Sequence, residues 1–153
     1  MPLVKKPISD ALTSWLQINN YTSENLNQPG ENGDSALMRL TREGNLDWMQ
    51  ELLAAGVDIN HRNNDGNNAL WFACFGNFEA AIDLLVAAGI DIDNQNDNGA
   101  TALMYTASAG KLKILQQLLN HGADVNLRNL DDFTALDFAS TEAVWRALKH
   151  AVK

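Results

Sequence analysis

Cysteine is almost absent from this sequence, which has one such residue, Cys74, among 153. A single thiol excludes an intramolecular disulfide framework and predicts a reducing compartment, the cytoplasm. Long apolar runs are also missing, since no stretch approaches the ~20 residues that a membrane-spanning helix needs. The first ten residues, MPLVKKPISD, have no apolar segment after the two lysines, so we expect no secretory signal.

Positive charge is scarce as well. Eleven lysines and arginines stand against nineteen aspartates and glutamates, and the net charge is −8. A field of this sign repels phosphate backbones and anionic lipid head groups, and no Lys/Arg cluster offsets it. We therefore expect no nucleic acid and no membrane as partner, and instead another protein with a basic or apolar surface.

Groups of residues that could hold a metal or perform catalysis are missing too. The three histidines are isolated, and none has a second metal ligand at a suitable spacing. The acidic stretch DIDNQNDNG is not an EF-hand loop, because Gly99 comes one place late for a loop starting at Asp93 and position 12 is not Glu. We therefore predict no metal, no cofactor and no catalytic residue, in a protein that is not an enzyme.

The sequence does contain an internal repeat with a period of 33 residues. Gly33, Gly66 and Gly99 follow one another at this spacing, and Asp132 takes the next place. An Ala-Leu pair begins three residues after each of them: Ala36-Leu37, Ala69-Leu70, Ala102-Leu103 and Ala135-Leu136. A period held so strictly predicts a stack of similar structural units.

Each period predicts a helix, a tight turn, a second helix and a projecting loop. The first helix is preceded by a residue that can cap it: Ser35, Asn68, Thr101 and Thr134. It is closed by a residue that tolerates the left-handed conformation: Gly44, Asn77 and Gly110. The second helix carries paired apolar residues and ends at another glycine: Gly56, Gly89 and Gly122.

At these residues the sequence resembles the ankyrin repeat family. The family motif T-P-L-H-x-A-A-x-x-G corresponds to SALMRLTREG, NALWFACFGN and TALMYTASAG, and L-L-x-x-G-A-D-V-N to LLAAGVDIN, LVAAGIDID and LLNHGADVN. The resemblance covers about residues 31 to 151. Two departures are systematic: Ala replaces the motif's Pro in every repeat, and its His becomes Met38, Trp71, Met104 and Asp137.

The resemblance implies an all-α ankyrin repeat solenoid of paired antiparallel helices with projecting β-turn loops. We divide the chain into an N-terminal capping helix and loop (1–30), three repeats (31–63, 64–96, 97–129) and a compressed C-terminal cap (130–153). The capping helix has one apolar face: Ile8, Leu12, Trp15 and Leu16. Taken as the second helix of a half-repeat, it ends at Asn19. The last helix starts near Thr141, and Trp15, Trp48 and Trp145 fall on inward faces.

The run NNALWFACFGN (67–77) has more apolar residues than one helix face can bury. At ~100° per residue, Leu70, Ala73 and Cys74 share the inward face, and Phe72 and Phe75 point outward. We therefore read Cys74 as a small buried residue and not as a nucleophile. Trp71 replaces a motif residue at the flank of the core, so both a packing and a binding role stay open for it and for Phe72.

Ankyrin domains bind other proteins through a concave face, so the resemblance implies a non-catalytic protein–protein interaction module, an adaptor or regulatory subunit. Outward positions and loop tips give the predicted partner-binding residues: Asp34, Arg39, Arg42, Asn67, Trp71, Phe72, Phe75, Tyr105, Ser108, Phe133 and Phe138. Two alternatives remain open. One is a small-ligand receptor or enzyme with an apolar aromatic pocket, and the other is a self-associating scaffold. For the interaction module we expect a monomer in the free state.

Overall fold

A computed structural model describes residues 6–152, and within that range the chain is helical with no β-strand. The α-helices are α1 Asp10–Ile18, α2 Ala36–Glu43, α3 Leu46–Ala54, α4 Ala69–Phe75, α5 Glu79–Ala87, α6 Ala102–Ser108, α7 Leu112–Asn120 and α8 Glu142–Ala151. Two short 3-10 turns, η1 Glu31–Gly33 and η2 Leu136–Phe138, complete the set. The predicted all-α solenoid of paired helices is confirmed.

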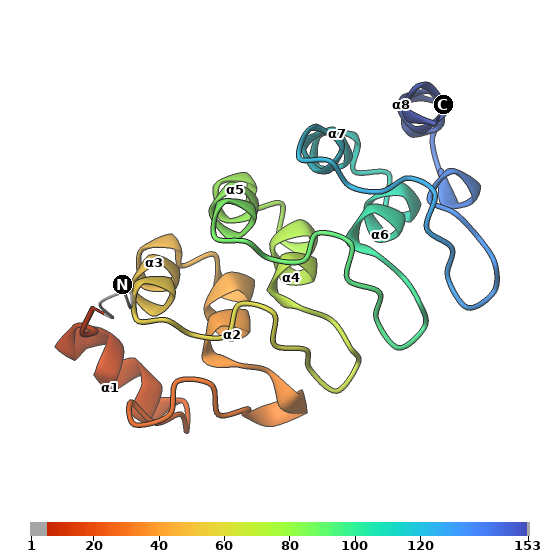
Figure 1. Cartoon of the computed structure of the whole chain (residues 1–153). Helices are drawn as coiled ribbons and strands as arrows, with labels where there is room; N and C mark the ends of the chain where they lie inside the picture. The colour runs from red at the N-terminus through yellow and green to blue at the C-terminus, as the bar shows by residue number, and fades with distance from the viewer. Residues whose placement is uncertain (1–5, 153) are drawn as a thin grey trace, which may run out of the picture.

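The helices form two rows, as Figure 1 shows in a view along the helix axes. The inner row consists of α2, α4, α6 and the turn η2, and the outer row consists of α3, α5, α7 and α8. Between consecutive helix pairs the chain runs out into long loops, which we call fingers, on the side opposite the outer row. The core lies between and along the rows, where Leu37, Leu70 and Leu103 are at most 2% exposed.

Helix starts and stops follow the sequence signals. The side chains of Ser35, Asn68 and Thr101 accept hydrogen bonds from backbone amides in the first turn of α2, α4 and α6. As predicted, residues in the left-handed backbone conformation follow these helices, with φ of 71° at Gly44 and 59° at Asn77. The 33-residue spacing therefore reflects the same capping chemistry in three successive units.

The fourth unit departs from this pattern at Thr134. The prediction that Thr134 caps a helix is wrong, because its backbone amide and hydroxyl both donate to Asp137 Oδ2, at 2.8 and 3.1 Å. These bonds hold the pKa of Asp137 below its ordinary value. Only the turn η2 forms there, and α8 then begins after Thr141, which caps it as expected.

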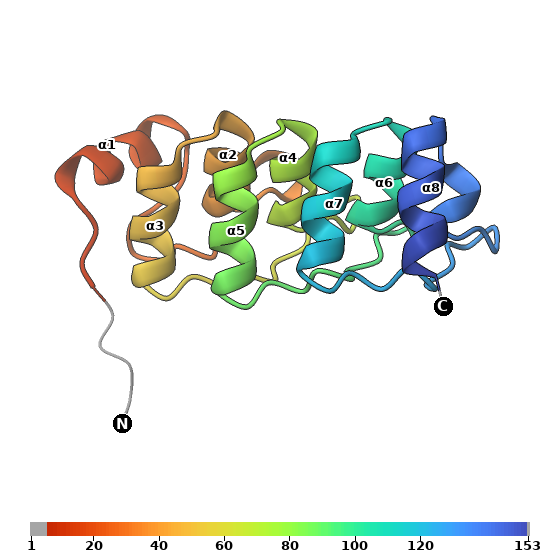
Figure 2. The ribbon, with the colours of Figure 1, turned by 90° about the horizontal axis from the view of Figure 1, so that it is seen from above.

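The N-terminal helix α1 closes one end of the stack. Leu12 and Leu16 are fully buried, and Trp15 stacks on Tyr21 with ring centroids 6.0 Å apart. The helix and its end at Asn19 are confirmed. Its predicted alignment as a second helix is not, because Figure 2 shows α1 lying across the end of the row that α3, α5, α7 and α8 form in parallel.

The tryptophan of the last helix corrects another prediction. Trp145 was expected in the core, yet it is 46% exposed, whereas Val144 and Leu148 beside it are fully buried. The reason is its place in the stack: among the described residues, no further helix follows α8 to cover it. Within the same range, no helix combines the length and apolar character that crossing a membrane requires.

Candidate functional site

The surface where the first helices meet the fingers, which we call the inner face, has two adjoining depressions. The first has a volume of about 330 Å³ and the second about 200 Å³, and Trp71 lines both. The first is lined by Asn32, Arg42, Asn63, Asp65, Asn67, Trp71, Phe72 and Phe75. The second is lined by Trp71, Ala100, Met104, Tyr105, Ser108 and Phe138. Most of the predicted binding residues therefore come together on one surface.

A buried carboxylate organises one side of the first depression. Asp34 is 3% exposed, and it lies 3.0 Å from Arg42 Nη2 and accepts a hydrogen bond of 2.9 Å from Asn63 Nδ2. The prediction that Asp34 is exposed at a loop tip is therefore wrong. Its charge is paired within the protein, which is the condition under which a buried carboxylate is tolerated.

Arg42 and Phe72 form the floor of the same depression. The Arg42 guanidinium carbon lies 4.3 Å above the Phe72 ring centroid, and the Arg42 side chain remains 45% exposed. Phe72 lies on this surface, as its outward position predicts, but Arg42 covers it and it is only 9% exposed, which favours the packing role that the sequence left open. The salt bridge to Asp34 and the ring hold the guanidinium in one orientation, with part of it open to solvent.

The fingers are held together by asparagines at a 33-residue spacing. Asn63, Asn96 and Asn129 each accept two backbone amides of their own turn. Asn96 also donates to Asn67 Oδ1 at 3.1 Å, which repeats the contact of Asn63 with Asp34 one unit along. Asn67 is thereby buried, and the prediction of an exposed loop-tip residue is wrong for it as well.

An aromatic cluster crosses from α4 to α6. The Trp71 and Tyr105 ring centroids are 4.9 Å apart, and Phe75 stacks on Tyr105 at 6.3 Å. Burial raises the pKa of the Tyr105 hydroxyl, so this side chain is neutral at physiological pH. Phe75 is 62% exposed at the end of the cluster, and Lys111 Nζ lies 5.8 Å from its ring centroid.

The remaining predicted residues lie at the edges of the inner face. Arg39 is half-buried and Ser108 is exposed at the rim of the second depression. Phe133 is 49% exposed on the last finger, and its ring packs edge-on against Phe138 with centroids 5.9 Å apart. These two rings extend the apolar surface towards the C-terminal end.

Sequence reasoning missed one charged residue of this region, Lys111. Its Nζ donates to the carbonyl oxygens of Cys74 and Phe75, at 3.1 and 2.8 Å, and to Asn77 Oδ1 at 2.8 Å. The ammonium group thus caps the C-terminal end of α4 from the next repeat. No repeated signal could have revealed it, because the equivalent residue one period earlier is Phe78.

Replacing Lys111 by methionine should lower the free energy of unfolding by about 1–2 kcal/mol, since three hydrogen bonds to a charged donor are lost while the aliphatic chain stays. Urea denaturation followed by circular dichroism measures the difference. Lys113→Met is the matched control, because the Lys113–Glu79 pair is exposed, and it should cost less than about 0.5 kcal/mol. Equal losses in the two variants would contradict the capping role of Lys111.

The lone thiol has no place in the site chemistry. Cys74 is fully buried, and burial raises the pKa of its thiol to about 12. The thiolate is the reactive form, so a side chain with this pKa is a poor nucleophile at neutral pH. Among residues 6–152, no group of three or more potential metal ligands comes together.

Comparison with known proteins places this fold in a family. The family described as ankyrin repeats (3 copies) matches residues 6–96 and again residues 76–151. The Notch-regulated ankyrin repeat-containing protein of Homo sapiens is 36% identical over 76 residues, which are 50% of this chain and 67% of that protein. Osteoclast-stimulating factor 1 of Gallus gallus is 35% identical over 65 residues, 42% of this chain.

The matched segment spans only 30% of the length of osteoclast-stimulating factor 1. Two matches of the family that together run from residue 6 to residue 151 cover nearly the whole chain. The same residues form the paired helices and fingers described above. The chain belongs to the ankyrin repeat family, whose repeats act as protein–protein interaction modules.

Proposed function

We propose that the chain is an adaptor or regulatory subunit, in the cytoplasm, that binds a segment of a partner protein along its inner face. The observation that carries this proposal is the pair of depressions on the two sides of Trp71. Next to them the Phe75 ring is 62% exposed, and an exposed aromatic ring beside pockets is typical of the anchor points of protein interfaces.

The chemistry of the surface indicates the kind of segment. The second depression is lined mainly by apolar and aromatic side chains and suits an apolar anchor. The fingers carry exposed acidic groups, Asp65 and Asp131 among them, and the whole chain has a net charge of −8. A partner segment with apolar side chains flanked by basic ones fits both features.

The experiment is a comparative affinity purification from the native host with the full chain as bait. Phe75→Ala removes the exposed ring, and Ser108→Arg places a large charged side chain at the rim of the second depression. We expect both variants to lose the partners that wild type retains, with affinity for a purified partner falling at least about tenfold.

Ile18→Ala is the matched control, because Ile18 is a 79% exposed apolar residue on α1, outside the residues lining the two depressions. It should retain every partner of the wild-type chain. If Phe75→Ala and Ser108→Arg retained the same partners as wild type, binding on the inner face would be refuted.

A small-ligand receptor is the competing function. The two depressions, about 330 and 200 Å³, lie near or below the lower limit of about 300 Å³ for ligand pockets. A thermal shift screen of metabolites decides between the functions. A ligand that raises the melting temperature of wild type, but not of Ser108→Arg, would favour the receptor.

A further inference from the structure

The exposed tryptophan of α8 occupies a position that is buried in every earlier repeat. Met49, Ile82 and Leu115 each stand four residues after the cap of their outer-row helix, and all three are fully buried. Trp145 stands four residues after the cap Thr141 and is 46% exposed. In the earlier repeats, the outer-row helix of the following repeat packs against the outer-row helix that precedes it, as α5 does on α3 and α8 on α7.

Trp145 is not a side chain that an exposed end of a solenoid requires. Terminal units normally present a polar outer face, because they have one neighbour and not two. Here the largest apolar side chain is placed on that face, and Lys149 Nζ covers part of it at 5.9 Å from the ring centroid. A half-exposed tryptophan of this kind is typical of a contact surface.

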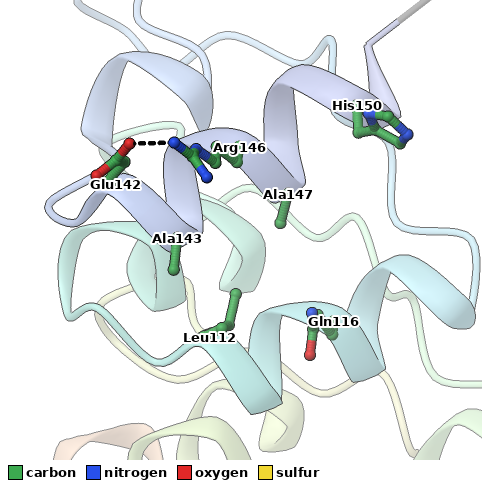
Figure 3. Close-up of a pocket in the computed structure, with 7 residues that line it drawn as sticks. All are labelled: Leu112, Gln116, Glu142, Ala143, Arg146, Ala147 and His150. Carbon is green, nitrogen blue, oxygen red and sulfur yellow. Dashed lines mark hydrogen bonds and ion pairs between the residues drawn. The ribbon is translucent and has the colours of Figure 1, made fainter.

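The charges around Trp145 have a definite order along the helix. Glu142, Arg146 and Lys149 are exposed and follow one another at helical spacings of four and three residues, so they share one side of α8 with Trp145. Figure 3 shows Ala143 and Ala147 pointing from α8 towards α7, and Glu142 joined to Arg146. The stripe therefore runs from an acidic end to a basic end. Ala143 and Ala147 face α7, and Glu142 and Arg146 also line the edge of the groove that α8 forms with Leu112 and Gln116 of α7.

Such a stripe is complementary to itself when the second helix runs in the opposite direction. An antiparallel copy brings Glu142 opposite Lys149 of the other chain, and Trp145 opposite Arg146, in two symmetric sets. Glu142 is the one acidic residue of α8, which also carries two basic residues on the stripe, in a chain whose net charge is −8. Helix α8 is therefore a surface on which two copies can approach with less repulsion than the acidic remainder of the chain imposes.

We propose that two copies of the chain associate through their α8 helices, antiparallel and about a two-fold axis, with Trp145 at the centre of the contact. One helix face per copy is smaller than the ~800 Å² per partner of a stable complex, so the dimer is weak and depends on concentration. At low concentration the chain is then a monomer, the state that we expect from the sequence. The inner face stays free in the dimer, so this inference is independent of the proposed function.

Sedimentation velocity of the full chain over a range of concentrations up to about 1 mM tests the inference. Wild type should shift from monomer to dimer, and Trp145→Gln should weaken the association at least about tenfold. Glu142→Lys and Lys149→Glu should each have a similar effect, because each places like charges opposite one another. An equimolar mixture of these two variants should recover the dimer, since every pair in the mixed complex is again of opposite sign.

Asp47→Lys is the matched control for Glu142→Lys, because Asp47 is an exposed acidic residue in the first turn of α3 and the change in net charge is the same. It should dimerise like wild type. If the wild-type chain stayed monomeric over the whole concentration range, the inference would be overturned. The exposed side of α8 would then be a contact surface for a different protein. A mixture that associates no better than its two components would overturn the antiparallel pairing.

Discussion

Phe72→Ala is expected to lower the free energy of unfolding by about 3–4 kcal/mol, whereas Phe75→Ala should change it by less than about 1 kcal/mol. The two phenylalanines lie three residues apart on α4, yet Phe72 is 9% exposed and Phe75 is 62% exposed. Loss of the buried ring leaves a cavity beside the core and removes the surface on which Arg42 rests. Urea denaturation followed by circular dichroism gives both values.

The same two variants should behave in the opposite order in binding. Folded Phe75→Ala should lose partner affinity, because its ring is the exposed one, although it unfolds at nearly the same urea concentration as wild type. Similar losses of stability for the two variants would show that Phe75 is also a core residue. The distinction between Phe72 as a packing residue and Phe75 as a binding residue would then no longer hold.

Gly66→Ala should cost about 3 kcal/mol of unfolding free energy, the second largest effect that we expect. Gly66 has a φ of 78°, which L side chains rarely adopt, and a Cβ there would lie 2.8 Å from the backbone nitrogen of Asp97. That nitrogen donates to Asp65 O at 3.0 Å and so links one finger to the next. The substitution therefore strains its own turn and also pushes two repeats apart.

Gly89→Ala separates these two costs. Gly89 has a φ of 93°, but a Cβ there meets no atom within 4 Å. We expect it to lose about 1 kcal/mol, the cost of the left-handed backbone alone. Thermal or urea unfolding of both variants gives the comparison, and equal losses would show that contact between the fingers adds nothing to stability.

Much of the fold could be read from local signals. Ser35 and Thr101 cap their helices, Gly44 and Asn77 end theirs, and Leu70 with Cys74 faces the core, as the helical spacing indicates. Each of these outcomes depends on residues within one turn of the chain. The 33-residue period then repeats the same local structure, so one correct unit predicts the others.

Apart from the cap expected at Thr134, the errors concern contacts between repeats. Asp34 and Asn67 look like loop-tip residues, but Asn63 and Asn96 of the next fingers bond to them and bury them. The recurrence of Asn63, Asn96 and Asn129 at a spacing of 33 residues was a signal for these contacts, which Asn63 and Asn96 make. Trp145 was misplaced for the opposite reason, since its spacing is that of a core residue but no helix within residues 6–152 covers it.

The repeat, the family, the caps of α2, α4 and α6 and the buried Leu70 and Cys74 of α4 follow from the amino-acid sequence alone, because they rest on local spacing and capping chemistry. The tertiary structure alone decided which outward side chains are free. It buried Phe72 under Arg42, left Phe75 open, and brought Lys111 to the end of the preceding α4. The physical reason is that the exposure of an outward side chain depends on the neighbouring repeats, whose equivalent positions lie 33 residues away in the chain on either side.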